Sequence, residues 1–153
     1  MWFRDIDRAG VAAVAARMRE WDRREIFATR FGDDEEAFVD DVMASGPLAW
    51  VAGLGDEPIA AFGCRELWPG MWSMWFFATD SLTKIGLSMT KLIVRVIVPS
   101  IKSFGARRME CRSMEGHDDA QRWLKVIGAN RESTLKGYGR EGQDFHVYAW
   151  EMA

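Results

Sequence analysis

The chain has 153 residues, of which 48% are hydrophobic and 28% are charged, and its formal net charge is -3. This composition excludes an intrinsically disordered or fibrous protein. The small negative charge gives no overall attraction to nucleic acid or to an anionic membrane. A chain of this length buries about 70% of its unfolded surface, so we expect one domain over residues 1–153.

Three sequence features bear on the compartment and on metal binding. The start, MWFRDIDRAG, lacks the basic flank and apolar stretch of a signal peptide, which predicts a cytoplasmic protein. The most apolar segment, 85–101, is interrupted by charged residues and a proline, which predicts a packed helix and no membrane span. Cys64 and Cys111 belong to no C-x-x-C pair or histidine cluster, so we expect reduced thiols, no disulfide and no metal.

The first third of the chain predicts a strand and two helices. The strand is MWFRDI, and Asp7 can cap a helix that runs from Arg8 to Arg24. The acidic run 33–36 begins a second helix, because carboxylates suit the positive end of the helix dipole. Apolar residues at helical spacing supply the buried sides of these helices: Val11, Val14, Ala15 and Met18 in the first, and Phe38, Val42 and Met43 in the second.

From Pro47 the hydrophobic pattern changes from helical to strand-like. Turn residues at 55–57 and 69–70 separate three predicted strands, which are 47–54, 58–67 and 71–78. The rest of the chain predicts a long helix ended by Gly105, a strand, a helix ended by Gly128 and two strands. These elements are 81–104, 106–113, 117–127, 130–138 and 143–152.

This order of elements carries a resemblance. Together with GHDDAQRWLKVIGA and ESTLKGYGREGQDFHVYAWE, it resembles the GCN5-related N-acetyltransferase (GNAT) superfamily. Ala120, Gly128 and the final pair of strands match that superfamily's Asn-x-x-Ala, its Gly-Phe and its closing antiparallel pair. The resemblance implies an α/β (α+β) protein with the acyl-CoA N-acyltransferase fold, a mixed and mostly antiparallel sheet flanked by helices.

Shorter stretches carry a narrower resemblance. RDID, AAFGCRELWPGMW, FATD and GARRMECRS, with the ending already quoted, are similar to the small acetyltransferase-like proteins of tailed bacteriophages. One branch of these comprises internal virion proteins of short-tailed phages. The resemblance implies a protein of the host cytoplasm that is incorporated into the virion and contacts other phage or host proteins.

The resemblance also implies where acetyl-CoA would bind, namely at the end of the central strand and the start of the long helix: Phe77, Ala78, Thr79, Lys84 and Gly86. The superfamily holds the pyrophosphate on backbone N–H groups of an Arg/Gln-x-x-Gly-x-Gly/Ala turn. Here ATDSLTKIGLSMTKL contains only Gly86 and no arginine. Lys84 has two interpretations, a phosphate contact or a solvated lysine. The site therefore resembles a degraded one.

The superfamily's general acid is a tyrosine that protonates the leaving thiolate. Alignment on Ala120 places Leu124 at that position, and leucine cannot donate a proton. Tyr138 is the substitute candidate, although a strand tyrosine with a satisfied hydroxyl is the structural alternative.

Three residues are candidates for a general base: Glu66, Asp80 and His117. Each also has a structural interpretation. Glu66 would be an outward strand residue, and Asp80 would be a cap or first-turn carboxylate of the long helix. His117 would cap its own helix or contact backbone.

Two surfaces are candidates for partners. Lys84, Lys91, Arg95 and Lys102 are predicted on one helix face, which is either a solvated face or a contact for nucleic acid or an acidic protein. In the stretch LWPGMWSMWFF, alternation places Trp75 and Phe77 in the core. Trp68 and Trp72 flank the turn, and we expect one of them to be an exposed partner anchor.

The resemblance, together with the missing glycine turn and tyrosine, implies two alternative functions. The first is a non-enzymatic, virion-associated protein that retains the acetyltransferase fold with a degraded acetyl-CoA site. The second is an active acetyl-CoA-dependent N-acetyltransferase that modifies a host protein or a small amine. Nucleic-acid binding through the basic face is a third and less favoured prediction.

Overall fold

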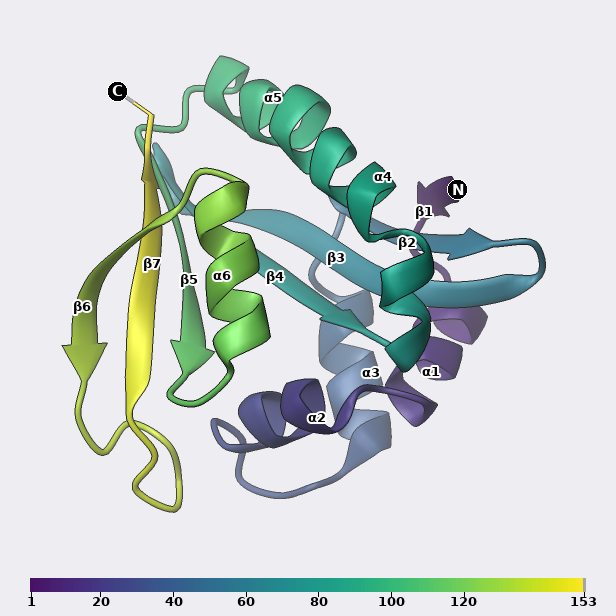
Figure 1. Ribbon diagram of the computed structural model, residues 1–153, viewed down its shortest axis with the longest axis horizontal. Coiled ribbons are helices and arrows are strands. Elements are labelled where there is room, and N and C mark those ends of the chain that lie inside the picture. The colour runs from purple at the N-terminus through teal and green to yellow at the C-terminus, as the bar shows by residue number, and fades with distance from the viewer. Residues whose placement is uncertain (153) are drawn as a thin grey trace.

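The computed structural model describes residues 1–152, and its centre is one seven-stranded sheet (Figure 1). The strand order is β1-β2-β3-β4-β5-β7-β6. All neighbours are antiparallel except β4 and β5, which run parallel. The strands are β1 (Trp2–Asp5), β2 (Ala49–Leu54), β3 (Glu57–Trp68), β4 (Met71–Ala78), β5 (Arg108–Met114), β6 (Asn130–Leu135) and β7 (Phe145–Glu151).

Helices cover both faces of the sheet. The helices are α1 (Arg8–Ala16), α2 (Glu20–Phe27), α3 (Glu35–Met43), α4 (Gly86–Leu92), α5 (Val98–Ser103) and α6 (Asp118–Val126). One core cluster joins α4, α5 and α6 to the sheet through residues such as Phe62 and Met109. A second cluster joins α1 and α3 to the opposite face through Val51 and Phe77. Among residues 1–152, no helix has the length and apolar composition that a membrane crossing requires.

The helix predicted from Arg8 to Arg24 is wrong in one respect, because the structure divides it into α1 and α2. Between them, Met18 forms a β-bridge with Thr79, and the Arg19 N–H donates to the Ala78 carbonyl. The backbone therefore pairs with the end of β4 at a point where local helical periodicity continues. A tertiary contact overrides the local pattern here.

The predicted long helix from 81 to 104 is present, with two irregular turns. It begins as a 3-10 turn over Asp80–Lys84 and contains a π-helical turn over Ile93–Ile97. Its buried residues recur every four positions, at Ile85, Met89, Ile93, Ile97 and Ile101. An α-helix has 3.6 residues per turn, so a four-residue repeat drifts around the axis. The wider π turn offsets that drift and keeps the five side chains on the sheet.

The tryptophan-rich strand is partly as predicted. Trp75 and Phe77 contact the core on the α1 and α3 face. Trp68 is 61% exposed, but Trp72 is only 6% exposed and its ring stacks on Phe104. The expectation that either residue could be the exposed anchor is therefore corrected for Trp72. Alternation along β4 turns this side chain into the main core.

This difference gives a stability prediction. Trp72→Ala should lower the free energy of unfolding by about 3–5 kcal/mol, because it removes a large buried ring. Trp68→Ala should change it by at most about 0.5 kcal/mol, as expected for an exposed side chain. Urea unfolding of both variants tests the assignment. Equal losses for the two variants would contradict it.

Candidate functional site

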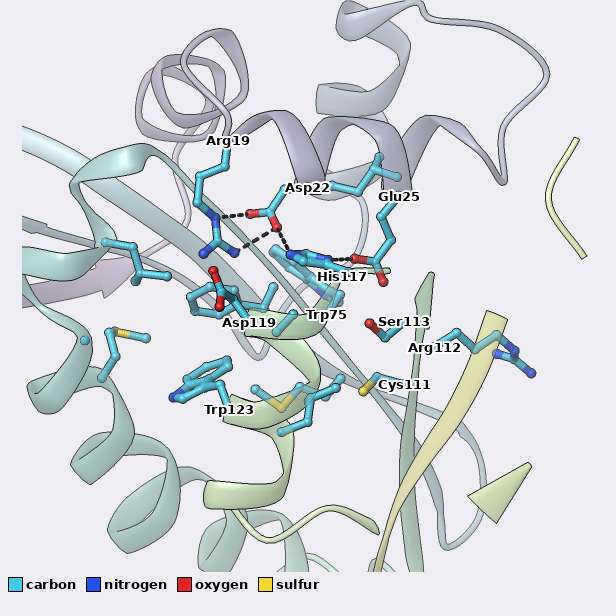
Figure 2. Close-up of a pocket in the computed structure, with 18 of the residues that line it drawn as sticks. Arg19, Asp22, Glu25, Trp75, Cys111, Arg112, Ser113, His117, Asp119 and Trp123 are labelled. Atoms are coloured by element: carbon cyan, nitrogen blue, oxygen red, sulfur yellow. Dashed lines mark hydrogen bonds and ion pairs between the residues drawn. The ribbon is translucent and has the colours of Figure 1, made fainter. Parts of the chain in front are cut away.

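A cavity of about 760 Å³ lies where β4 and β5 separate (Figure 2). Its walls come from β4, β5, α2, α4, α6 and the loop between β6 and β7. The volume lies within the range of about 300–1,000 Å³ that is typical of small-molecule sites. One wall is apolar and continuous with the main core, and it includes Met74, Phe76, Met89, Trp123 and Leu124.

The cavity exists because β4 and β5 pair over only three residues, Met71 to Ser73. Beyond Ser73 the two strands diverge, and α6 lies over the gap (Figure 1). The Thr79 N–H donates to the Ile59 carbonyl in β3. The N–H and carbonyl of the preceding residue, Ala78, point to the other side of β4 and hydrogen-bond to Asp22 and Arg19. Since backbone groups alternate sides along a strand, those of Met74 and Phe76 also face away from β3, toward the cavity they line.

Helix α2 holds the open end of β4 in place. The Ala78 N–H donates to Asp22 Oδ2 at 2.9 Å, and the Ala78 carbonyl accepts from the Arg19 N–H. The Arg19 guanidinium binds the same carboxylate with two hydrogen bonds, of 2.8 and 3.0 Å. Asp22 is only 4% exposed, so this is a nearly buried, bidentate ion pair.

The other end of α2 holds β5 and α6. Glu25 accepts a hydrogen bond from the Met114 N–H at 2.9 Å and contacts Nδ1 of His117. The Nε2 atom of His117 lies 3.4 Å from Asp22 Oδ1, and the imidazole stacks on Trp21. Helix α2 therefore joins both sides of the gap between β4 and β5 (Figure 2).

The network formed by Arg19, Asp22, Glu25 and His117, called here the α2 network, also meets the geometric requirement for a metal ligand set. Ligand atoms of Asp22, Glu25 and His117 lie within 4.8 Å of one another. However, Arg19 already donates to both Asp22 oxygens, and its charge would oppose a divalent ion. We therefore interpret the network as an ion-pair cluster that joins structural elements.

The cavity also contains a thiol and a hydroxyl from β5. Burial raises the pKa of the Cys111 thiol to about 12, and the nearby charges of Glu25 and Glu110 act in the same direction. The thiol is therefore protonated at neutral pH and is a poor nucleophile. The Ser113 hydroxyl is buried and accepts a long hydrogen bond from Gln121.

Of the five residues predicted for acetyl-CoA, one lines the cavity and four do not. Gly86 lines it at the start of α4, whereas Phe77 points into the core on the opposite face of the sheet. The Ala78 N–H already donates to Asp22 of α2, and the Thr79 hydroxyl accepts from the Ser81 N–H. Lys84 is exposed and lies 3.9 Å from Glu57. If Gly86 is the last glycine of the superfamily turn, Lys84 occupies the place of the first.

The structure brings three of the four candidate acids and bases to the cavity. Asp80, His117 and Tyr138 line the cavity, and Leu124 does so at the position aligned with the superfamily's tyrosine. Glu66 is an exposed strand residue that accepts from the Gly70 N–H at the turn, and it does not line the cavity. Asp80 lies in the first turn of the 3-10 helix, as its structural interpretation predicted.

Two of these placements differ from the sequence predictions. Tyr138 lies in the loop after β6 and not on a strand, and its ring packs on Phe145. His117 occupies the N-cap position of α6 but its side chain makes no capping hydrogen bond. The reason is that both imidazole nitrogens face carboxylates of α2.

Sequence reasoning missed Arg19, Asp22 and Glu25, because the predicted continuous helix from 8 to 24 placed them on an ordinary polar surface. A signal was nevertheless present. Asp22 and Glu25 are three residues apart, and carboxylates at that spacing share a face of a helix. What the spacing could not show was the buried histidine 92 residues away that this face meets.

Solved structures with the same architecture are numerous. The ribosomal-protein-S18-alanine N-acetyltransferase of Escherichia coli aligns over 99% of this chain and 94% of its own, with 12% identity and a TM-score of 0.70. The ribosomal-protein-alanine N-acetyltransferase of Brucella melitensis aligns over 99% of both chains, with 13% identity and a TM-score of 0.72. This chain has the GNAT acetyltransferase fold. The predicted fold class is confirmed.

A protein assigned to the GNAT family from Desulfovibrio desulfuricans aligns over 99% of both chains, with 20% identity and a TM-score of 0.65. No protein-family model and no curated protein matches the sequence significantly. At these identities the likeness establishes the fold, and function has to be argued from the site.

Proposed function

We propose that the chain is an acetyltransferase-like protein that binds the pantetheine arm of acetyl-CoA in the cavity and transfers its acetyl group slowly or not at all. The open edge of β4 is the observation that carries this proposal. Met74 and Phe76 direct backbone groups toward the cavity beyond the last residue paired with β5. A pantetheine arm contains two amides, which can hydrogen-bond to such an edge as an added strand does.

The cavity offers fewer groups that could bind the phosphates of the cofactor than groups that could bind its pantetheine arm. A helix start attracts anions, and Thr83 and Gly86 bring the start of α4 to the cavity. The glycine turn of the superfamily is replaced by a 3-10 turn, and no arginine precedes it. We therefore expect the arm and the acyl group to contribute most of the binding free energy.

Leu124 and the α2 network support slow transfer. Leu124 has no proton for a leaving thiolate, and it lines the cavity where the superfamily has tyrosine. His117 is only 3% exposed, and both of its nitrogens are held by carboxylates, so it has no free nitrogen for an acceptor amine.

If the chain binds the cofactor without transferring the acetyl group, we expect it to act through partners. Together with the resemblance to phage proteins, this supports a virion- or particle-associated role in the host cytoplasm. Co-purification with assembled particles would test that role.

The alternative is an active N-acetyltransferase, and the position of Tyr138 favours it. This residue lines the cavity from the β6–β7 loop, and it is partly exposed. Its hydroxyl could replace the missing general acid if the loop moved closer on substrate binding.

Calorimetric titration with acetyl-CoA, followed by a thiol-release assay with amine acceptors, separates these outcomes. We expect saturable binding with a Kd of about 1–100 μM, which corresponds to about -8 to -5 kcal/mol, and no thiol release above the uncatalysed rate. Acceptor-dependent thiol release that Tyr138→Phe abolishes would establish the enzyme instead. Lack of binding at millimolar acetyl-CoA would contradict the proposal.

A further inference from the structure

The long helix that covers the cavity has an unusual outer face. Its four basic residues are all exposed: Lys84, Lys91, Arg95 and Lys102. Between them, Leu87 is 70% exposed and Val94 is 43% exposed. These six residues, called here the basic face, combine four exposed cations with two exposed apolar side chains.

The basic face has almost no partners within the chain. Within residues 1–152, Lys91, Arg95 and Lys102 form no ion pair, and Lys84 has only a 3.9 Å contact with Glu57. Most other arginines of this structure are paired with carboxylates, such as Arg8 with Asp40 and Arg140 with Asp33. In a chain with a net charge of -3, these cations are therefore available to an external acidic surface.

The same helix forms a wall of the cavity. Thr83, Gly86, Met89 and Thr90 line the cavity, while Leu87 and Lys91 lie in the same turns and are exposed to solvent. A partner on the basic face would therefore sit beside the cavity and could deliver an arm into it.

The phosphate end of the cavity indicates which kind of donor fits. Free CoA ends in a pyrophosphate and a phosphorylated adenosine, and the turn that would hold them is absent here. A protein-borne phosphopantetheine arm has a single phosphodiester. The carrier can supply the remaining contacts through its own surface.

We propose that the basic face docks an acidic, helical carrier domain whose acyl-phosphopantetheine arm enters the cavity. This inference rests on the proposed function, because it requires pantetheine binding along β4. Opposite charges guide the encounter, and Leu87 and Val94 form the apolar centre of the contact.

Binding affinity measured on surface-immobilised protein tests the proposal. The carrier is a bacterial acyl carrier protein, titrated in its apo and acetylated forms. Acetyl-CoA and acetyl-pantetheine are titrated as small probes. We expect the acetylated carrier to bind about tenfold more tightly than either small probe. Lys91→Glu/Arg95→Glu should weaken the carrier at least about tenfold and leave acetyl-pantetheine unchanged. The matched control Lys125→Glu/Arg131→Glu reverses two exposed charges on α6 and β6 and should have little effect.

Several results would overturn the inference while the proposed function stands. One is acetyl-pantetheine binding as tightly as the acetylated carrier, and another is equal loss in the two double variants. A third is that a single-stranded oligonucleotide binds through Lys91 and Arg95 while the carrier does not bind. If neither the carrier nor the small thioesters bind, the proposed function fails together with the inference.

Discussion

Asp22→Ala should be among the most destabilising single substitutions outside the apolar core. Asp22 accepts two hydrogen bonds from Arg19 and one from the Ala78 N–H, and it faces His117. Removing one partner of a buried ion pair leaves the other charge uncompensated, which costs about 3–5 kcal/mol. Chemical unfolding should therefore show a loss of that size in the free energy of unfolding.

Asp40→Ala is the matched control. Asp40 pairs with Arg8 at 2.5 Å, but both side chains are more than half exposed. Solvent screens such a pair, so its loss should cost less than about 1 kcal/mol. If the two alanine variants were equally stable, helix α2 would not be held by the α2 network as described.

Leu124→Tyr should increase acetyl transfer. The substitution places a phenol in the cavity wall at the position that the proposed alignment with the GNAT superfamily assigns to its general acid. A positioned general acid contributes about 10²–10⁴-fold to a rate, so we expect at least about a 10²-fold increase in thiol release from bound acetyl-CoA. Single-turnover measurement with a primary amine as acceptor gives this rate.

Leu124→Phe controls for the added ring volume in that experiment. It fills the same space without a hydroxyl, so it should bind acetyl-CoA and remain inactive. If both variants were inactive while retaining acetyl-CoA binding, a missing general acid would not be the reason for slow transfer. An equal gain in both would point to packing and not to proton transfer.

Most of the fold was predictable from the sequence, because the strands and helices follow local hydrophobic periods. The turn at Pro69–Gly70 and the helix end at Gly105 are examples, since both glycines adopt positive φ angles. The break between α1 and α2 was not predictable in this way. It depends on Arg19 pairing with Ala78, which is 59 positions later in the chain and carries no local signal.

The candidate site was less predictable than the fold. Leu124 and Gly86 both line the cavity. The role of His117 could not be read from its sequence neighbours, because the carboxylates that hold it lie on α2. Trp72 was expected beside an exposed turn, but its side chain belongs to the main core.

The open edge of β4 is the proposed contact for a pantetheine thioester. The most direct test follows the backbone amides of Met74 and Phe76 by NMR during titration with acetyl-CoA. We expect these two amides to shift and to gain protection from hydrogen exchange at saturation, while that of Trp75, which faces β3, changes little. Saturable binding that leaves Met74 and Phe76 unchanged would contradict it.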